Sequence, residues 1–216
     1  MRGRHGVLAT QGKLPLPKDI PDMTKTERAW QRMLSGRRLD LLNPSPLDIE
    51  IEDIAHGLAR VARWNGQTKG AHVFSVAQHC VLVERIVGDL KPRTSREGRL
   101  AALLHDAPEY VIGDMISPFK AALGIDYKDF ENRLLAAIHL RFGLGATQPA
   151  DLAALIKRAD RISAFYEATQ LAGFGLTEAR GIFGTPPTTM KAPRLAGLDP
   201  ADAQAQFLER FKRLAP

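Results

Sequence analysis

Three short stretches of the sequence each place a histidine or an aspartate on, or at the end of, an otherwise apolar helical segment. These stretches are residues 75–79, 103–107 and 157–161. Burying Asp106 and Asp160 among leucine, alanine and isoleucine is costly unless a positive charge compensates them. A divalent cation is the strongest compensator, and the imidazoles of His79 and His105 complete a mixed nitrogen and oxygen ligand set. The sequence therefore predicts that these four side chains converge on one metal ion.

The adjacent residues His105 and Asp106 restrict the geometry further. Neighbouring residues on a helix point about 100° apart, so both reach one ion only if it lies beside the end of the helix. Pro108 is predicted to end this helix, because the residue before a proline is pushed out of α geometry. Each ligand taken alone has an alternative interpretation: a hydrogen-bonded core histidine, or a helical aspartate paired with a neighbouring arginine.

The composition favours packed helices. The 216 residues are 44% hydrophobic but only 6% aromatic, and alanine and leucine are abundant. We predict an all-α domain over residues 26–216, preceded by an extended basic arm at 1–25. Periodic apolar residues predict helices at 24–34, 51–64, 73–87, 96–107, 127–142, 149–172 and 200–214. A loop with a short β-ribbon is predicted near 37–50, and an irregular excursion at 173–198, which holds five glycines and three prolines.

The excess of basic charge is confined to the N-terminal part. Residues 1–38 carry nine basic and three acidic residues, whereas residues 39–216 carry 21 of each. A nucleic-acid-binding protein is expected to have a clustered basic face, so nucleic acid is not the expected partner. The sequence shows no signal-peptide core, no bilayer-length apolar stretch and a single cysteine, Cys80. We therefore expect a cytoplasmic protein with no membrane contact.

The order of the four ligands resembles the H…HD…D pattern of the HD-domain superfamily. It is most similar to the bacterial HD-type phosphohydrolases that include 5′-deoxynucleotidases. The likeness continues through Leu-His-Asp-Ala-Pro-Glu-Tyr-Val-Ile-Gly-Asp at 104–114 and Ser-Pro-Phe-Lys at 117–120, and it spans residues 47–173. It implies an HD-domain helical bundle around one metal that hydrolyses a phosphomonoester, with a nucleoside 5′-monophosphate as the expected substrate.

The resemblance and the residue chemistry together suggest two catalytic residues. Glu109 follows Asp106 by three residues and is placed to accept a proton from the attacking water. The alternative for Glu109 is a first-turn carboxylate favoured by the helix dipole. Asp114 matches a family residue that serves the leaving group or orients water.

Four further residues are predicted to bind the substrate. Arg63 can clamp a phosphate through two hydrogen bonds, and Trp64 can pack on a sugar or base. Lys120 can hold a phosphate at the start of a helix, and His72 can line the entrance to the site. A helix-end core aromatic for Trp64 and an exposed surface lysine for Lys120 are open alternatives.

The ligand chemistry also narrows the metal. Imidazole ligands argue against Mg²⁺ and leave Mn²⁺, Co²⁺, Fe²⁺, Ni²⁺ or Zn²⁺. Two imidazoles and two carboxylates leave coordination positions open for water and a phosphoryl oxygen. HD proteins with two metals need extra histidines between Asp106 and Asp160, where only His139 occurs, so one metal per chain is expected.

Two other functions stay open at this point. One is a different HD-type phosphoesterase or an oxygenase. The other is a non-catalytic regulatory or nucleic-acid-binding protein that uses the basic arm. The polar loop at 65–70 and the segment 173–198 depart from the deoxynucleotidase pattern, so the sequence does not fix base or sugar preference. Relatives of this type often pair through helices, so a homodimer is the expected assembly.

Overall fold

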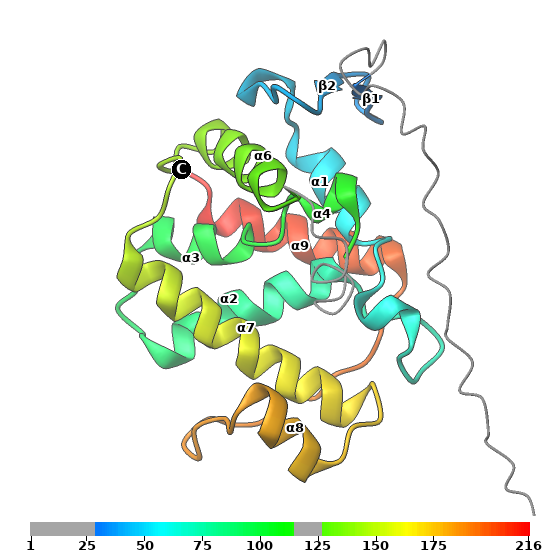
Figure 1. The fold of residues 1–216 in the computed structure, drawn as a ribbon, viewed down its shortest axis with the longest axis vertical. Coiled ribbons are helices and arrows are strands. Elements are labelled where there is room, and N and C mark those ends of the chain that lie inside the picture. The colour runs from blue at the N-terminus through cyan, green and yellow to red at the C-terminus, as the bar shows by residue number, and fades with distance from the viewer. Residues whose placement is uncertain (1–28, 115–126) are drawn as a thin grey trace, which may run out of the picture.

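The computed structural model describes residues 29–114 and 127–216, and it is mostly helical, as the sequence predicts (Figure 1). Its α-helices are α1 (Ile51–Leu58), α2 (Val76–Leu90), α3 (Arg96–Leu103), α4 (Glu109–Ile112), α6 (Tyr127–Arg141), α7 (Ala150–Gln170), α8 (Leu176–Phe183) and α9 (Pro200–Leu214). Two 3-10 helices are η2 (Pro46–Asp48) and η3 (Arg63–Gly66). The predicted arm at 1–25 lies outside the described residues. Within the described part of the chain, no helix combines the length and apolarity needed to cross a bilayer.

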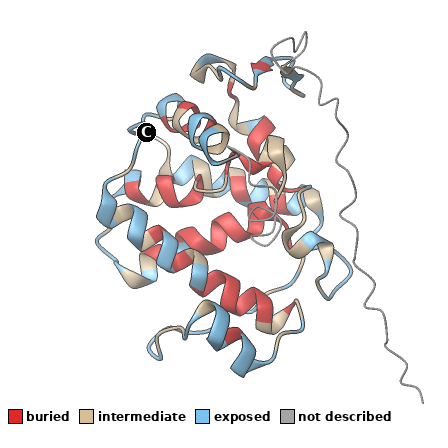
Figure 2. Cartoon of the chain, in the orientation of Figure 1, coloured by how far each residue is buried: buried red, intermediate tan, exposed pale blue. Residues whose placement is uncertain are grey.

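Helix α2 lies at the centre of the hydrophobic core. Helices α3, α7 and α9 pack against it, and most of its residues are buried (Figure 2). The helix begins in a capping box, in which the Ser75 side chain accepts from the Gln78 backbone and the Gln78 side chain accepts from the Ser75 backbone. The capping box therefore fixes the start of α2 one turn before His79, which is fully buried.

The predicted helix at 51–64 is shorter in the structure, and α1 ends at Leu58. The chain then forms a bridge between Ala62 and Ser75, in which the Arg63 amide donates to the Phe74 carbonyl. Tertiary pairing has overridden the helical pattern here. Trp64 follows with a φ of 57°, a left-handed conformation that an α-helix does not contain. The break redirects Arg63 and Trp64 away from α1.

The predicted helix at 96–107 also ends early, at Leu103. Short turns follow, in which the Ala107 amide donates to the Leu104 carbonyl and the Glu109 amide to the Asp106 carbonyl. Pro108 has helical dihedral angles and starts α4 rather than ending α3. His105 and Asp106 therefore lie in the turn between two helices.

Two other predictions need correction. The β-ribbon is confirmed, but β1 (Trp30–Arg32), which pairs antiparallel with β2 (Arg38–Asp40), occupies part of the predicted helix at 24–34. The predicted irregular excursion at 173–198 contains α8, which packs on α7. The glycine and proline count concealed α8 because the glycines lie mostly at its ends. By contrast, α9 has the predicted bounds of 200–214.

A buried carboxylate ties three helices together. Glu84 of α2 is fully buried, and its two oxygens each lie 2.5 Å from an arginine: Arg99 Nε of α3 and Arg210 Nε of α9. A buried charge is stabilising only when it is fully paired, and removing one partner leaves the others uncompensated. Glu84 therefore fixes how α3 and α9 lie against α2.

Replacing Glu84→Gln is expected to lower the free energy of unfolding by about 2–3 kcal/mol, because Arg99 and Arg210 then face each other without a carboxylate. Chemical denaturation in urea measures the change. Glu209→Gln is the matched control, since Glu209 pairs with Arg213 on the exposed surface of α9, and its cost should be below about 1 kcal/mol. Equal costs for the two variants would contradict a structural role for the Glu84 cluster.

Candidate metal centre

Three separate parts of the fold bring the predicted ligands together. His79 comes from the first turn of α2, His105 and Asp106 from the turn after α3, and Asp160 from the middle of α7. One ligand atom each from His79, His105 and Asp160 lies within 4.8 Å of the others. Asp106 Oδ2 lies beside this group, 3.4 Å from His79 Nε2 and 3.3 Å from His105 Nε2. The four residues therefore form one cluster.

The two imidazoles are oriented by their other ring nitrogens. His79 Nδ1 lies 2.6 Å from Glu167 Oε1, and His105 Nδ1 lies 2.9 Å from the Ala102 carbonyl oxygen. Each neutral ring therefore carries its proton on Nδ1, since its partner can only accept. Both Nε2 atoms are buried and make no hydrogen bond to any described residue. The Nε2 lone pairs of His79 and His105 are thus directed at carboxylate oxygens. Because lone pairs and carboxylate oxygens repel each other, a positive charge is needed between them.

The pKa values of Asp106 and His105 also indicate that the cluster needs positive charge. Burial raises the pKa of Asp106, but the imidazoles of His105 and His79 outweigh it and hold the pKa well below its usual range. Burial lowers the pKa of His105, yet the Asp106 carboxylate more than compensates and raises the pKa. The carboxylates thus draw positive charge to the ring nitrogens, and a proton or a cation can supply it.

Glu167 contacts the ligand His79 on the side of the ring away from the cluster, and it was not among the predicted site residues. It is fully buried on α7, and its oxygens accept from the Ser163 hydroxyl at 2.7 Å, the Arg63 Nε at 3.2 Å and the Trp64 indole at 2.9 Å. Burial raises the pKa of Glu167, but His79 and Arg63 outweigh it and lower the pKa. A usable signal was present: Glu167 follows Asp160 by seven residues, about two helical turns, so both lie on one face of α7.

The predicted catalytic residues lie near the ligands. Glu109 is 3% exposed in the first turn of α4, and its charge acts on Arg63. Asp114 Oδ2 lies 3.0 Å from Arg63 Nη1. Arg63 therefore contacts two carboxylates, Asp114 and Glu167, which raise its pKa against the effect of burial. In this structure Arg63 compensates the negative charge of Asp114 and Glu167. Its predicted role in binding a phosphate stays a prediction.

The other predicted substrate residues differ in their placement. The Trp64 ring packs against Phe174 and Phe183, with ring centroids 5.5 and 5.9 Å away, which favours the core-aromatic interpretation. His72 is exposed and lies before the start of α2, and its place at the entrance to the site stays a prediction. Lys120 lies outside the described residues.

Two curated proteins are similar to this chain. The uncharacterized protein RCAP_rcc00048 of Rhodobacter capsulatus is 57% identical over 185 residues, covering 85% of this chain and 94% of that protein. The uncharacterized protein YfdR of Escherichia coli K12 is 35% identical over 173 residues, covering 78% and 85%. The chain belongs to the YfdR family. No protein-family model matches the chain.

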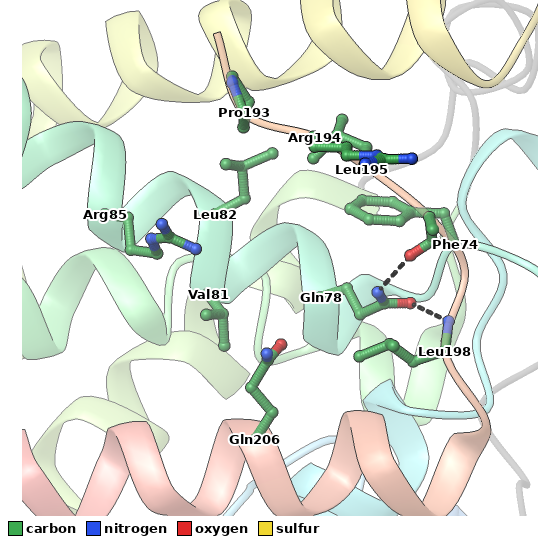
Figure 3. Close-up of a pocket in the computed structure, with 11 residues that line it drawn as sticks. Phe74, Gln78, Val81, Leu82, Arg85, Pro193, Arg194, Leu195, Leu198 and Gln206 are labelled. Atoms are coloured by element: carbon green, nitrogen blue, oxygen red, sulfur yellow. Dashed lines mark hydrogen bonds between the residues drawn. The ribbon is translucent and has the colours of Figure 1, made fainter. Parts of the chain in front are cut away.

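A cavity of about 630 Å³ adjoins the ligands in this member of the YfdR family. His105, Asp106 and Asp160 form part of its lining, together with residues of α6 and α7. A smaller cavity of about 280 Å³ lies between α2, α9 and the segment before α9 (Figure 3). There the Gln78 side chain bonds the Ala196 carbonyl and the Leu198 amide, and no histidine or carboxylate lines the wall. Of these two cavities, the larger one is lined by His105, Asp106 and Asp160 of the ligand cluster.

His139 of α6 also lines the larger cavity. It is 3% exposed, and burial lowers the pKa of its imidazole to about 4. The unfolded chain binds a proton at this side chain near pH 6.5, whereas the folded chain does so only near pH 4. The resulting stability is fully present above pH 6.5 and is lost as the pH falls towards 4.

Replacing His139→Gln is expected to reduce the acid sensitivity of the YfdR-family fold, because glutamine does not titrate. Between pH 7 and pH 5 the free energy of unfolding of the variant should fall by about 1–2 kcal/mol less than that of the unaltered chain. Urea denaturation at the two pH values measures the difference. The same decrease in both proteins would show that His139 takes up protons equally in the folded and unfolded states.

Proposed function

We propose that this chain is a metal-dependent phosphohydrolase that releases phosphate from a phosphomonoester, with a nucleoside 5′-monophosphate as the substrate. In this proposal His79, His105, Asp106 and Asp160 hold one divalent cation. The observation that carries the proposal is the pair of buried Nε2 atoms, which face carboxylates and lack hydrogen bonds within the described residues. A ring whose Nδ1–H is held by a carboxylate or a carbonyl, with Nε2 presented, is the usual form of a metal-binding histidine. The resemblance of the ligand order to the HD-domain pattern supports the same proposal.

The charge balance of the cluster also favours a divalent cation. Among the described residues, four carboxylates of the cluster meet two basic side chains: Asp106, Asp114, Asp160 and Glu167 against Arg63 and Lys157. This excess of negative charge in a largely buried cluster is unfavourable unless it is compensated. A doubly charged ion would balance it. Mixed imidazole and carboxylate ligands suit Mn²⁺, Co²⁺, Fe²⁺, Ni²⁺ or Zn²⁺ better than Mg²⁺.

The described residues suggest how the reaction would proceed. A bound divalent cation would lower the pKa of water and neutralise charge on the phosphoryl group. Glu109, buried at the start of α4, would take the proton of the attacking water. Asp114, whose Oδ2 lies 3.0 Å from Arg63 Nη1, would orient water or serve the leaving oxygen. Glu167 holds the His79 ring in the orientation that presents Nε2.

The variants Asp106→Ala and Asp160→Ala each remove one proposed ligand. We expect the unaltered chain to bind about one Mn²⁺ or Co²⁺ and to release phosphate from mononucleotides. We expect each variant to lose at least about tenfold in metal affinity, together with its phosphatase activity. Elemental mass spectrometry and a phosphate-release panel measure both properties. Asp151→Ala, at an exposed position of α7, is the matched control and should retain both. Absence of bound metal and of phosphate release in the unaltered chain would overturn the proposal.

Glu167→Gln tests the support behind the ligands. Glutamine keeps the shape of the side chain but loses the charge that holds the His79 Nδ1–H, so we expect metal affinity to fall by about 10- to 100-fold. Titration calorimetry with Mn²⁺ measures this change. The control is Glu178→Gln, an exposed glutamate of α8, which should bind metal like the unaltered chain. If Glu167→Gln only lowered stability and left metal affinity intact, its role would be structural alone.

A further inference from the structure

One face of α7 borders the larger cavity and carries a proposed ligand. The described residues of α7 that line the cavity are Ala153, Ile156, Lys157 and Asp160. Their spacing of i, i+3, i+4 and i+7 is that of a single helix face, so Lys157 lies on the same face as the ligand Asp160. The neighbouring Arg158 is exposed and does not belong to this lining.

The two oxygens of Asp160 have different partners. Oδ1 lies 3.5 Å from His79 Nε2, whereas Oδ2 accepts from Lys157 Nζ at 2.8 Å. The oxygen that faces the cluster is therefore not the oxygen that holds the ammonium. An ammonium has three N–H donors, and Asp160 is the partner of Lys157 within the described residues. Since 73% of the Lys157 side chain is exposed, a ligand can reach the remaining donors.

The charges that line the cavity give Lys157 a particular position. Among the described residues of the lining it is the one lysine or arginine, and three carboxylates accompany it: Asp106, Glu131 and Asp160. A phosphate monoester carries a charge of about −1.5 to −2 at neutral pH, so its approach to these carboxylates is unfavourable without nearby positive charge. Besides a metal, the Lys157 ammonium is the group that supplies this charge within the described lining.

Arg63 is less well placed for the same role. Its Nε lies 3.2 Å from Glu167 and its Nη1 lies 3.0 Å from Asp114, so two of its three nitrogens are already paired with carboxylates. Arg63 is also not among the described residues that line the larger cavity. A phosphate that reaches the cluster through this cavity would therefore meet Lys157 and not Arg63.

We propose that Lys157 is a phosphate-binding residue of the enzyme, with its ammonium donating to a phosphoryl oxygen of a ligand bound at the cluster. This inference rests on the proposed function, because the metal ligands and the phosphate belong to one site. It adds the side from which the phosphate approaches, which is the cavity lined by α6 and α7. It also favours doubly charged monoesters over singly charged diesters, since the attraction grows with the charge of the ligand.

Phosphate binding to the full chain, loaded with Mn²⁺ and freed of excess metal, tests the role of Lys157. Lys157→Met keeps an unbranched side chain but removes the charge and the donors. We expect the Kd for inorganic phosphate, measured by titration calorimetry, to rise at least about tenfold in this variant. Lys157→Arg keeps a positively charged donor and should restore most of the affinity. An unchanged Kd in Lys157→Met would overturn the proposal.

Arg158→Met is the matched control, because it removes the same charge from the next position of α7, outside the described cavity lining. It should leave the Kd for phosphate unchanged. Equal weakening in the two methionine variants would show a general charge effect and refute a specific contact. Titration of the metal-free chains with Mn²⁺ detects a role limited to orienting Asp160. In that case Lys157→Met would bind metal more weakly but, once loaded, would bind phosphate normally, which also refutes the proposal.

These measurements distinguish failure of this inference from failure of the proposed function. Phosphate release by the unaltered chain, combined with phosphate binding that does not depend on Lys157, would refute the role of Lys157 alone. Phosphate binding that depends on Lys157, without hydrolysis of any mononucleotide, would refute the proposed function alone. If the metal-loaded chain binds no phosphate, both are wrong.

Discussion

Buried imidazole nitrogens directed at partly buried carboxylates are the interaction on which the rest of this structure depends. The Nε2 atoms of His79 and His105 lie 3.3–3.5 Å from oxygens of Asp106 and Asp160, and neither has a hydrogen bond within the described residues. Such an arrangement is stable only if positive charge lies between the nitrogens and the oxygens. Since the ligands come from α2, from the turn after α3 and from α7, that charge also holds together three parts of the core.

Glu167 connects this centre to the periphery of the fold. Its carboxylate accepts from α7 itself, from the His79 ring on α2, and from Arg63 and Trp64 in the 3-10 helix η3. The Trp64 ring in turn packs on Phe174, which precedes α8, and on Phe183, the last residue of α8. The segment after α7 therefore acts as a support for the cluster. A mutation of Trp64, Phe174 or Phe183 would therefore affect the position of the ligands through the Glu167 carboxylate.

The sequence was most informative where a pattern depends on local chemistry. Apolar periodicity placed α6, α7 and α9 to within a few residues, and the cost of burying Asp106 and Asp160 identified the cluster. The sequence pattern was misleading where tertiary contacts determine the backbone. The predicted helix at 51–64 ends early because Ala62 pairs with Ser75, and this pairing determines where Arg63 and Trp64 lie. Glu167 was missed since no motif marks a supporting carboxylate, although its helical spacing from Asp160 was visible.

Anomalous diffraction from crystals grown with Mn²⁺ or Co²⁺ tests the central claim most directly. A single strong peak is expected between the two imidazoles, about 2.0–2.3 Å from both Nε2 atoms and from an oxygen each of Asp106 and Asp160. A well-ordered cluster with no anomalous peak, in which protons on Nε2 bond the carboxylates directly, would contradict it.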